Sequence, residues 1–377
     1  MRKYFCFIPA ALLCAAFFLC SCSSRAYTLR TYHYMDVLDT VSTIQLYLTP
    51  EQDREDYESW IHERLLSYHR LFDAYNSYEG LNNVCTINEN AGVAPVAVDE
   101  DLFELIEFSV DNMDETGGNT NIAFGSVTQI WKDFMSAVQI EEARAAQMSG
   151  EGEAVSYIPT TPFPSEEELT EAARHTDISS LILDEEARTV YLADPDMRLD
   201  VGAVAKGYIA EKLADDLAQA GIESACISLG GNVKILGKRL ADDGRDYYTS
   251  AIQNPQYDPD SEDPAAQNSY LDNMIVRLND QETMVTSGNY ERFVDIGGIR
   301  YSHLIDPVTL QPAQQMSSVT ILAQDSGLAD YLSTALFMVD VETGKEILSH
   351  YEGAEACWVT SDYQVYMSSG FADHLVQ

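Results

Sequence analysis

The segment from Leu199 to Gly237 constrains the fold more than any other part of the sequence. A turn with two glycines, LDVGAVAKG, leads into a stretch with helical spacing of its apolar residues. Gly221 follows as a helix-ending residue, and an apolar strand then ends in Gly230-Gly231. The segment therefore predicts a turn, a helix and a strand in direct succession. One face of that helix carries Ile209, Leu213 and Leu217.

The rest of the chain mixes helices and strands without strict βαβ alternation, which predicts an α+β fold. Apolar patterns predict strands at 37–48, 181–192 (a hairpin), 274–278, 283–287, 292–296 and 318–323. They predict helices at 51–72, 101–115 and 325–339, and a short helix after Gly125. Two acidic stretches rich in glycine or proline, near 148–165 and 242–268, are expected to form surface loops.

The first residues have the pattern of a secretion signal. Arg2 and Lys3 precede an apolar run from Phe5 to Leu19, which is shorter than the roughly 20 residues that span a bilayer. The run ends in Leu19-Cys20-Ser21-Cys22, which resembles a bacterial lipobox. We therefore expect a signal peptide at 1–21, lipidation of Cys22, a stalk at 22–34 and one domain at 35–377 of two intimately joined lobes. The alternatives are an ordinary signal peptide cut near Ser21 or an uncleaved anchor.

Charge limits the possible partners. The formal net charge is −39, and removal of Arg2 and Lys3 with the leader makes it −41. Such a chain repels nucleic acid and anionic lipid headgroups, so neither is an expected partner. After cleavage the cysteines other than Cys22 are Cys85, Cys226 and Cys357, and they are too scattered to indicate a disulfide framework. Cys226 and Cys357 lie in apolar runs and are predicted to be buried thiols.

Two glycine-bearing turns could approach a ligand closely. In LDVGAVAKG, Gly202 and Gly207 free the backbone, the helix start offers N–H groups, and Lys206 adds a charge suited to phosphate. The spacing fits neither standard nucleotide loop, so a tight strand–helix turn and a phosphate cradle are both open. The Gly230-Gly231 turn is likewise either a ligand approach or a simple turn.

Other candidate residues lie on a helix and in two loops. Asp330 and Thr334 are one helical turn apart and could bind a hard cation, or Thr334 could simply bond a backbone carbonyl. His303 could act as a general base or be structural. Asp306 precedes Pro307 and is expected to fix a turn. Tyr75 could stack on an aromatic ligand or merely pack.

Taken in order, these pieces resemble the ApbE family, the FAD:protein FMN transferases. The resemblance extends from about Met35 to Val359. The matching pieces are LDTVSTIQLY, LFDAYNSYEGLNNVCTIN, NIAFGSVTQIW, LDVGAVAKGYIAEKLADDL, ISLGGNVKILG, TSGNYERF, YSHLIDPVTLQP and ADYLSTALF. It implies an ApbE-like (T-fold-like) α+β fold with mixed or antiparallel sheets flanked by helices, and an FAD cleft between two lobes.

The resemblance also implies a reaction. Members cleave the pyrophosphate of FAD with Mg²⁺, transfer FMN to a Thr or Ser hydroxyl of an acceptor protein and release AMP. Some relatives mainly hydrolyse FAD to FMN and AMP, so a Mg²⁺-dependent FAD pyrophosphatase is an alternative. A third alternative is a non-catalytic, flavin-binding surface lipoprotein. The implied partners are FAD and exported flavin-acceptor proteins, and the implied location is the outer face of the bacterial cell membrane.

By the same resemblance, roles fall on particular residues. The metal ligands are Asp330, Thr334 and the backbone carbonyl of Ala203, and His303 is the base. Tyr75 covers the isoalloxazine. The remaining FAD contacts are expected at Leu38, Thr40, Asn121, Lys206, Gly230, Gly231, Asn232, Ser287, Gly288, His303 and Asp306.

The sequence departs from the family pattern at three places. Leu38, Asp39 and Thr40 stand where Met-Gly-Thr is more usual. NIAFG, which begins at Asn121, stands where many members have Asp-Pro-Thr-Val-Gly. AIQNP stands where Gly-Ile-x-Asp-Pro is common, which weakens any role for Asn254.

Overall fold

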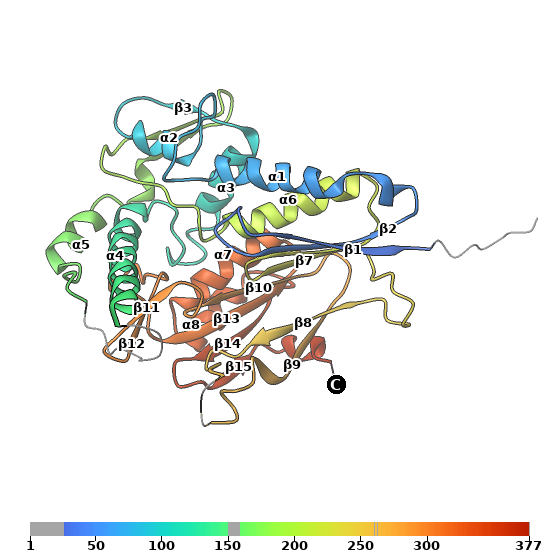
Figure 1. Ribbon diagram of the computed structural model, residues 1–377. Helices are drawn as coiled ribbons and strands as arrows, with labels where there is room; N and C mark the ends of the chain where they lie inside the picture. The colour runs from blue at the N-terminus through green and yellow to red at the C-terminus, as the bar shows by residue number, and fades with distance from the viewer. Residues whose placement is uncertain (1–25, 150–158, 260, 262, 377) are drawn as a thin grey trace, which may run out of the picture.

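An eight-stranded antiparallel sheet forms the centre of the fold (Figure 1). The computed structural model describes residues 26–149, 159–259, 261 and 263–376. In spatial order the strands are β1 (Thr28–Tyr34), β2 (Ser42–Leu48), β6 (Ala225–Leu229), β7 (Asn232–Leu236), β10 (Thr283–Gly288), β13 (Met316–Ala323), β14 (Glu355–Thr360) and β15 (Val365–Met367). The α+β class and the antiparallel sheet predicted from the sequence are confirmed.

Helices cover one face of this sheet. α6 (Ala205–Gln219) and α7 (Ser326–Phe337) pack side by side on it, and α1 (Tyr57–Leu71) lies over α6 (Figure 1). The predicted apolar stripe of α6 is fully buried. α7 carries almost no exposed residue, because it is enclosed by the sheet, α6 and α8 (Val341–Leu348).

A smaller layer joins the same core. Its sheet has the order β3 (Val96–Ala97), β5 (Thr189–Leu192), β4 (Leu181–Asp184), and it is accompanied by α2 (Val84–Glu89) and α3 (Glu100–Asp111). Buried side chains of α3 and β5 belong to one apolar cluster with those of β2 and α6. α4 (Gly125–Ser149) and α5 (Glu166–Ala173) stand beside this layer (Figure 1).

Two hairpin-like pairs flank the main sheet. β8 (Tyr248–Gln253) pairs with β9 (Tyr270–Leu278), and their apolar side chains pack on the sheet face opposite the helices, around Tyr47 and Ile235. β11 (Phe293–Ile296) pairs with β12 (Ile299–Ser302) and packs on α4, where Tyr301 stacks on Trp131 at a centroid distance of 6.3 Å. Short 3-10 turns lie at Gln52–Arg54, Ile178–Ser180 and Phe371–His374.

Some predicted boundaries were wrong for physical reasons. The helix expected at 51–72 is split, because Asp56 caps a new helix start by accepting the Ser59 amide. The helix after Gly125 runs to Ser149 rather than being short, and Phe134 and Val138 continue its buried face. The predicted hairpin at 181–192 and the predicted strands near 274–278, 283–287, 292–296 and 318–323 are confirmed.

Two loop predictions are corrected by long-range pairing. Thr28–Tyr34, expected in the stalk, form β1 along the full length of β2. The stretch 242–268 contains β8, which β9 stabilises. Cys357 is buried as predicted, whereas Cys226 is only partly covered. The signal peptide and Cys22 lie outside the described residues. Within the described part, no helix is long and apolar enough to cross a membrane.

Candidate active site

The predicted metal ligand Asp330 lies at the contact between α6 and α7. Its Oδ2 accepts the backbone N–H of Gly207 at 2.8 Å and the side-chain amide of Asn232 at 3.2 Å. A Cβ on Gly207 would lie 2.1 Å from the carbonyl oxygen of Ser326, so only glycine permits this approach of the two helices. The contact thus brings two of the predicted site residues, Asp330 and Asn232, to the start of α6.

The expected oxygen ligands lie in α7 and in the turn that precedes α6. The Gly207 amide donates to Asp330, while Tyr208 makes the ordinary helical bond to Val204. Ala203 precedes Val204, the N-cap of α6, so its carbonyl lies outside the helical hydrogen-bond ladder. Thr334 lies one turn after Asp330 and is 8% exposed.

A carboxylate, a hydroxyl and a carbonyl form the hard-oxygen set that Mg²⁺ prefers. Burial raises the pKa of Asp330, and a cation at the carboxylate would offset that cost. The residues present therefore fit the expected Mg²⁺. Ser287, another predicted contact, accepts or donates a hydrogen bond with Ser333 at 2.7 Å and lies 3.4 Å from the Thr334 hydroxyl.

The Gly230-Gly231 turn meets the loop that contains Leu38 and Thr40. Gly230 has φ +52°, and a Cβ there would lie 2.2 Å from the Thr40 hydroxyl oxygen. Its N–H donates to the Val41 carbonyl at 3.3 Å. Leu38 has φ +60°, and its N–H donates to His69 Nδ1 at 3.2 Å. The loop with Leu38 and Thr40 and the Gly230-Gly231 turn, which are far apart in sequence, are therefore in contact. Asn232, the residue after this turn, bonds Asp330.

His303 follows β12 and is held by a single carbonyl. Both its N–H and its ring Nδ1 lie near the Arg292 carbonyl oxygen, at 3.0 and 3.2 Å. Burial, together with the positive charges of Arg292 and Lys206, lowers the pKa of His303 to about 3. The ring is therefore neutral at pH 7. Because a carbonyl only accepts, Nδ1 carries the hydrogen and Nε2 keeps a lone pair. Such a ring can accept a proton.

Tyr75 is 44% exposed and borders a small hollow with Asp200 and Arg198. Its hydroxyl lies 3.5 Å from Asp200 Oδ2, which also accepts the Thr128 hydroxyl at 3.1 Å. Lys132 Nζ sits 3.0 Å from the Tyr75 ring centroid. Burial lowers the pKa of Lys132. The geometry adds Asp200 and Lys132 to the candidate site.

Neither of these added residues was expected from the sequence. Asp200 belongs to the LDVGAVAKG turn, and its place in that candidate ligand-binding turn could have indicated a role in the site. For Lys132, the sequence held no signal, because its partner Tyr75 lies far away in the chain.

The side chains of three residues make hydrogen bonds that hold the backbone around them. Asn121 accepts the Ala123 amide and donates to the Thr176 carbonyl. Asp306 accepts the Val308 and Thr309 amides, which confirms the predicted turn. Flavin contacts by Asn121 and Asp306 stay predictions. Asn254, where the family pattern is broken, donates to the carbonyls of residues 265 and 268 and holds its own loop. Gly288 ends β10, where a Cβ would lie 2.6 Å from the Tyr290 ring.

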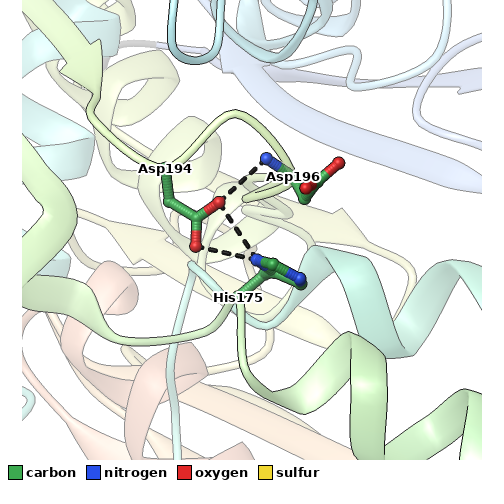
Figure 2. Close-up of side chains that lie close together, drawn as sticks. All are labelled: His175, Asp194 and Asp196. Carbon is green, nitrogen blue, oxygen red and sulfur yellow. Dashed lines mark hydrogen bonds and ion pairs between the residues drawn. The ribbon is translucent and has the colours of Figure 1, made fainter.

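A second cluster with metal-ligand chemistry contains His175, Asp194 and Asp196 (Figure 2). His175 Nδ1 lies 2.8 and 3.0 Å from the two oxygens of Asp194, and Asp194 also accepts the Asp196 amide at 2.9 Å. These hydrogen bonds hold a turn at Asp194, and none of the predicted site residues belongs to the cluster.

Known proteins resemble this chain over most of its length. The profile of the ApbE family matches residues 38–358. The FAD:protein FMN transferase of Treponema pallidum (strain Nichols) is 32% identical over 298 residues, which cover 78% of this chain and 74% of that protein. That of Klebsiella pneumoniae (strain 342) is 29% identical over 309 residues, which cover 80% of this chain and 84% of that protein.

Solved structures agree in fold. The flavin transferase ApbE of Vibrio cholerae superposes with a TM-score of 0.72 at 23% identity, covering 93% of this chain and all of that one. Because the family profile spans most of the sequence, the chain belongs to the ApbE family.

Proposed function

We propose that this chain transfers FMN from FAD to a Thr or Ser hydroxyl of an exported acceptor protein, with Mg²⁺, and releases AMP. The observation that carries the proposal is the buried Asp330 carboxylate, fixed by Gly207 at the start of α6 beside two glycine turns. The names of the curated relatives support the same reaction.

Different residues bind the pyrophosphate, the isoalloxazine and the metal ion. The backbone at Gly230 and Gly231 and the ammonium of Lys206 hold the pyrophosphate, because glycine lets phosphate oxygens approach N–H groups closely. Tyr75 offers an exposed ring on which the isoalloxazine stacks. Asp330, Thr334 and the Ala203 carbonyl would hold Mg²⁺, which would neutralise charge on the pyrophosphate.

His303 accepts the proton of the acceptor hydroxyl. The acceptor hydroxyl oxygen forms a bond to the phosphorus of the FMN half, and its proton passes to Nε2 of His303. The bond from that phosphorus to the bridging oxygen breaks, and the oxygen leaves with AMP. Anionic pyrophosphate beside Arg292 and Lys206 offsets the two charges that lower the pKa of His303, which makes the ring a stronger base when substrate is bound.

The location remains part of the proposal. An acylated Cys22 would stand only six residues before β1, a reach of about 20 Å for an extended chain. The tether would therefore hold the β1 side of the main sheet close to the membrane, where exported acceptors are found. Mass spectrometry of the membrane-bound protein tests this: a diacylated N-terminal Cys22 is expected, and an unmodified N-terminus would contradict it.

One assay tests the reaction. The mature protein is incubated with FAD, Mg²⁺ and an extract of exported proteins, and AMP release is followed together with flavin fluorescence of protein bands in a denaturing gel. AMP release with a fluorescent band is expected, and EDTA should abolish both. AMP release from FAD alone, with no band in any extract, would instead identify an FAD pyrophosphatase. Flavin binding without AMP release would overturn the enzymatic proposal.

A further inference from the structure

A buried lysine on β7 forms an ion pair one helical turn away from the proposed metal site. The Lys234 side chain is 1% exposed, and its Nζ lies 2.8 Å from Glu211 Oε1. Nζ also donates to the carbonyl oxygens of Gln281 at 3.1 Å and Gln324 at 2.6 Å. All three hydrogens of the ammonium group are therefore used. A lysine is buried to this degree only where its charge and its N–H groups are paired.

Glu211 connects this lysine to the start of α7. Its second oxygen, Oε2, accepts the backbone N–H of Ser326 at 2.8 Å. Ser326 is the first residue of α7, and the first amides of a helix have no partner within the helix. The hydroxyls of Ser326 and Thr283 are also hydrogen-bonded, at 3.1 Å. The carboxylate of Glu211 thus ties the first turn of α7 to α6 directly and to β7 through Lys234.

The three elements that meet at Asp330 meet again at this ion pair. Residues four apart share one face of a helix, and residues two apart share one face of a strand. The residues that make the two sets of contacts are spaced in this way: Gly207 and Glu211 on α6, Ser326 and Asp330 on α7, and Asn232 and Lys234 on β7. The ion pair therefore lies in the layer of contacts next to the one that holds the Asp330 carboxylate.

The two layers differ in the cation that the carboxylate receives. Lys234 supplies a cation to Glu211 from within the chain, whereas Mg²⁺ is the cation expected at Asp330. Burial raises the pKa of Glu211, and the charge of Lys234 opposes that shift. Because the ammonium group belongs to the chain, the spacing of α6, α7 and β7 in this layer does not depend on a bound metal ion.

We propose that Glu211 and Lys234 are positioning residues for the Mg²⁺ site, and that their ion pair holds the start of α7 where Asp330 can bind the ion. The inference rests on the proposed function, because Mg²⁺ at Asp330 is part of that function. Neither residue is a metal ligand; both act through Ser326 and the first turn of α7. Replacing residues that orient metal ligands in this indirect way typically lowers metal affinity by about tenfold to a hundredfold.

Glu211→Gln tests the proposal with little change in shape. The single oxygen of glutamine cannot stand at both places where the Glu211 oxygens accept, one beside Lys234 Nζ and one beside the Ser326 amide. The probe is Mn²⁺, which prefers the same oxygen ligands as Mg²⁺, and its binding to the FAD-free chain is followed by electron paramagnetic resonance. We expect the Kd for Mn²⁺ to rise about tenfold or more. The rate of AMP release from FAD at saturating Mg²⁺ should stay within about threefold of wild type, because the ligands themselves are kept.

Two further variants separate positioning from a loss of stability. Glu211→Gln/Lys234→Met removes both charges, so it leaves no unpaired buried charge to prevent folding. It should lose about as much Mn²⁺ affinity as Glu211→Gln alone, because both variants break the same ion pair. Leu217→Ala is the matched control: Leu217 is a buried residue of α6 outside the ion pair, so its loss should lower the temperature of unfolding and leave the Kd for Mn²⁺ within about twofold.

The outcomes distinguish this inference from the proposed function. An unchanged Kd for Mn²⁺ in Glu211→Gln or in the double variant overturns the positioning role, and so does an equal rise in Leu217→Ala. If the wild-type chain binds Mn²⁺ no better than Asp330→Asn does, the metal site of the proposed function fails, and the positioning role fails with it.

Discussion

The backbone N–H of Gly207 donates a 2.8 Å hydrogen bond to the carboxylate of Asp330, which lies 123 residues later in the chain. The bond ties the first turn of α6 to the middle of α7 and fixes one oxygen of a fully enclosed carboxylate. Ala203 stands just before Val204, the N-cap of α6, and its carbonyl lies outside the helical ladder. One contact thus joins two helices and positions the carboxylate of the proposed metal site.

Replacing Asp330 should lower the activity of the protein without lowering its thermal stability. Asp330→Asn keeps an oxygen for the Gly207 amide but removes a buried charge, so thermal unfolding without Mg²⁺ should occur at an equal or higher temperature at pH 7. Turnover of FAD should fall by about a hundredfold or more, because charge on the pyrophosphate is no longer offset. Calorimetry and AMP release measure the two effects.

Thr334→Ser should retain turnover of FAD, because it keeps the hydroxyl, and Thr334→Val should lose it. Equal activity of both variants would refute Thr334 as a metal ligand.

Gly207→Ala tests the packing of the two helices. Its Cβ would meet the Ser326 carbonyl oxygen at 2.1 Å and Asp330 Cβ at 2.6 Å, so α6 and α7 must move apart. We expect a loss of about 1–3 kcal/mol in the free energy of unfolding, measured in urea, together with weaker Mg²⁺-dependent turnover. Gly327→Ala is the control at the same contact, since its nearest neighbour is the Asp325 side chain at 3.3 Å. Similar losses in both variants would contradict this account.

His303 should make stability depend on pH in a defined direction. Its pKa is about 3 in the folded chain and near 6.5 when unfolded, so the unfolded state binds more protons between these values. Stability from the neutral ring is complete above pH 6.5 and is lost as pH falls. At pH 5 the wild type should therefore lose about 2 kcal/mol relative to His303→Gln, and nothing at pH 8.

Urea titrations at the two pH values measure this, with His350→Gln as the control because His350 is half-exposed and pairs with Glu115. His303→Gln should also slow acceptor labelling while leaving the Kd for FAD nearly unchanged. A Kd raised as much as the rate is lowered would assign His303 to binding instead.

Tyr75 should contribute to flavin affinity mainly through its ring. Tyr75→Ala removes the stacking surface and should weaken FAD binding about tenfold, followed by quenching of flavin fluorescence. Tyr75→Phe keeps the ring and loses only a 3.5 Å contact to Asp200, so its Kd should stay within about threefold. If both variants bind FAD like wild type, the isoalloxazine does not stack on this residue.

Local patterns predicted much of this architecture. The buried stripe of α6 and the shared face of Asp330 and Thr334 follow from helical spacing, which depends only on nearby residues. The end of β6 at Gly230 follows from the need for a positive φ. Turn chemistry also predicted the Asp306 turn, where the side chain bonds amides two and three residues later.

Pairing across the chain could not be predicted in this way. β1 was expected in a stalk because its own sequence is polar, and it is a strand only because β2 supplies hydrogen bonds along its length. β8 depends on β9 for the same reason. Lys132 contacts Tyr75 because α4 packs beside the smaller layer. The spacing of the two residues along the chain therefore could not predict that contact.

The amino-acid sequence by itself determined the order of elements, the glycine turns, the family to which the chain belongs and the residue types of the site. Those features depend on local backbone preferences and short spacings. The tertiary structure alone decided that Gly207 bonds Asp330 and that Asp200 and Lys132 join Tyr75. Such contacts join distant segments, and only the burial of a shared core brings those segments to hydrogen-bonding distance.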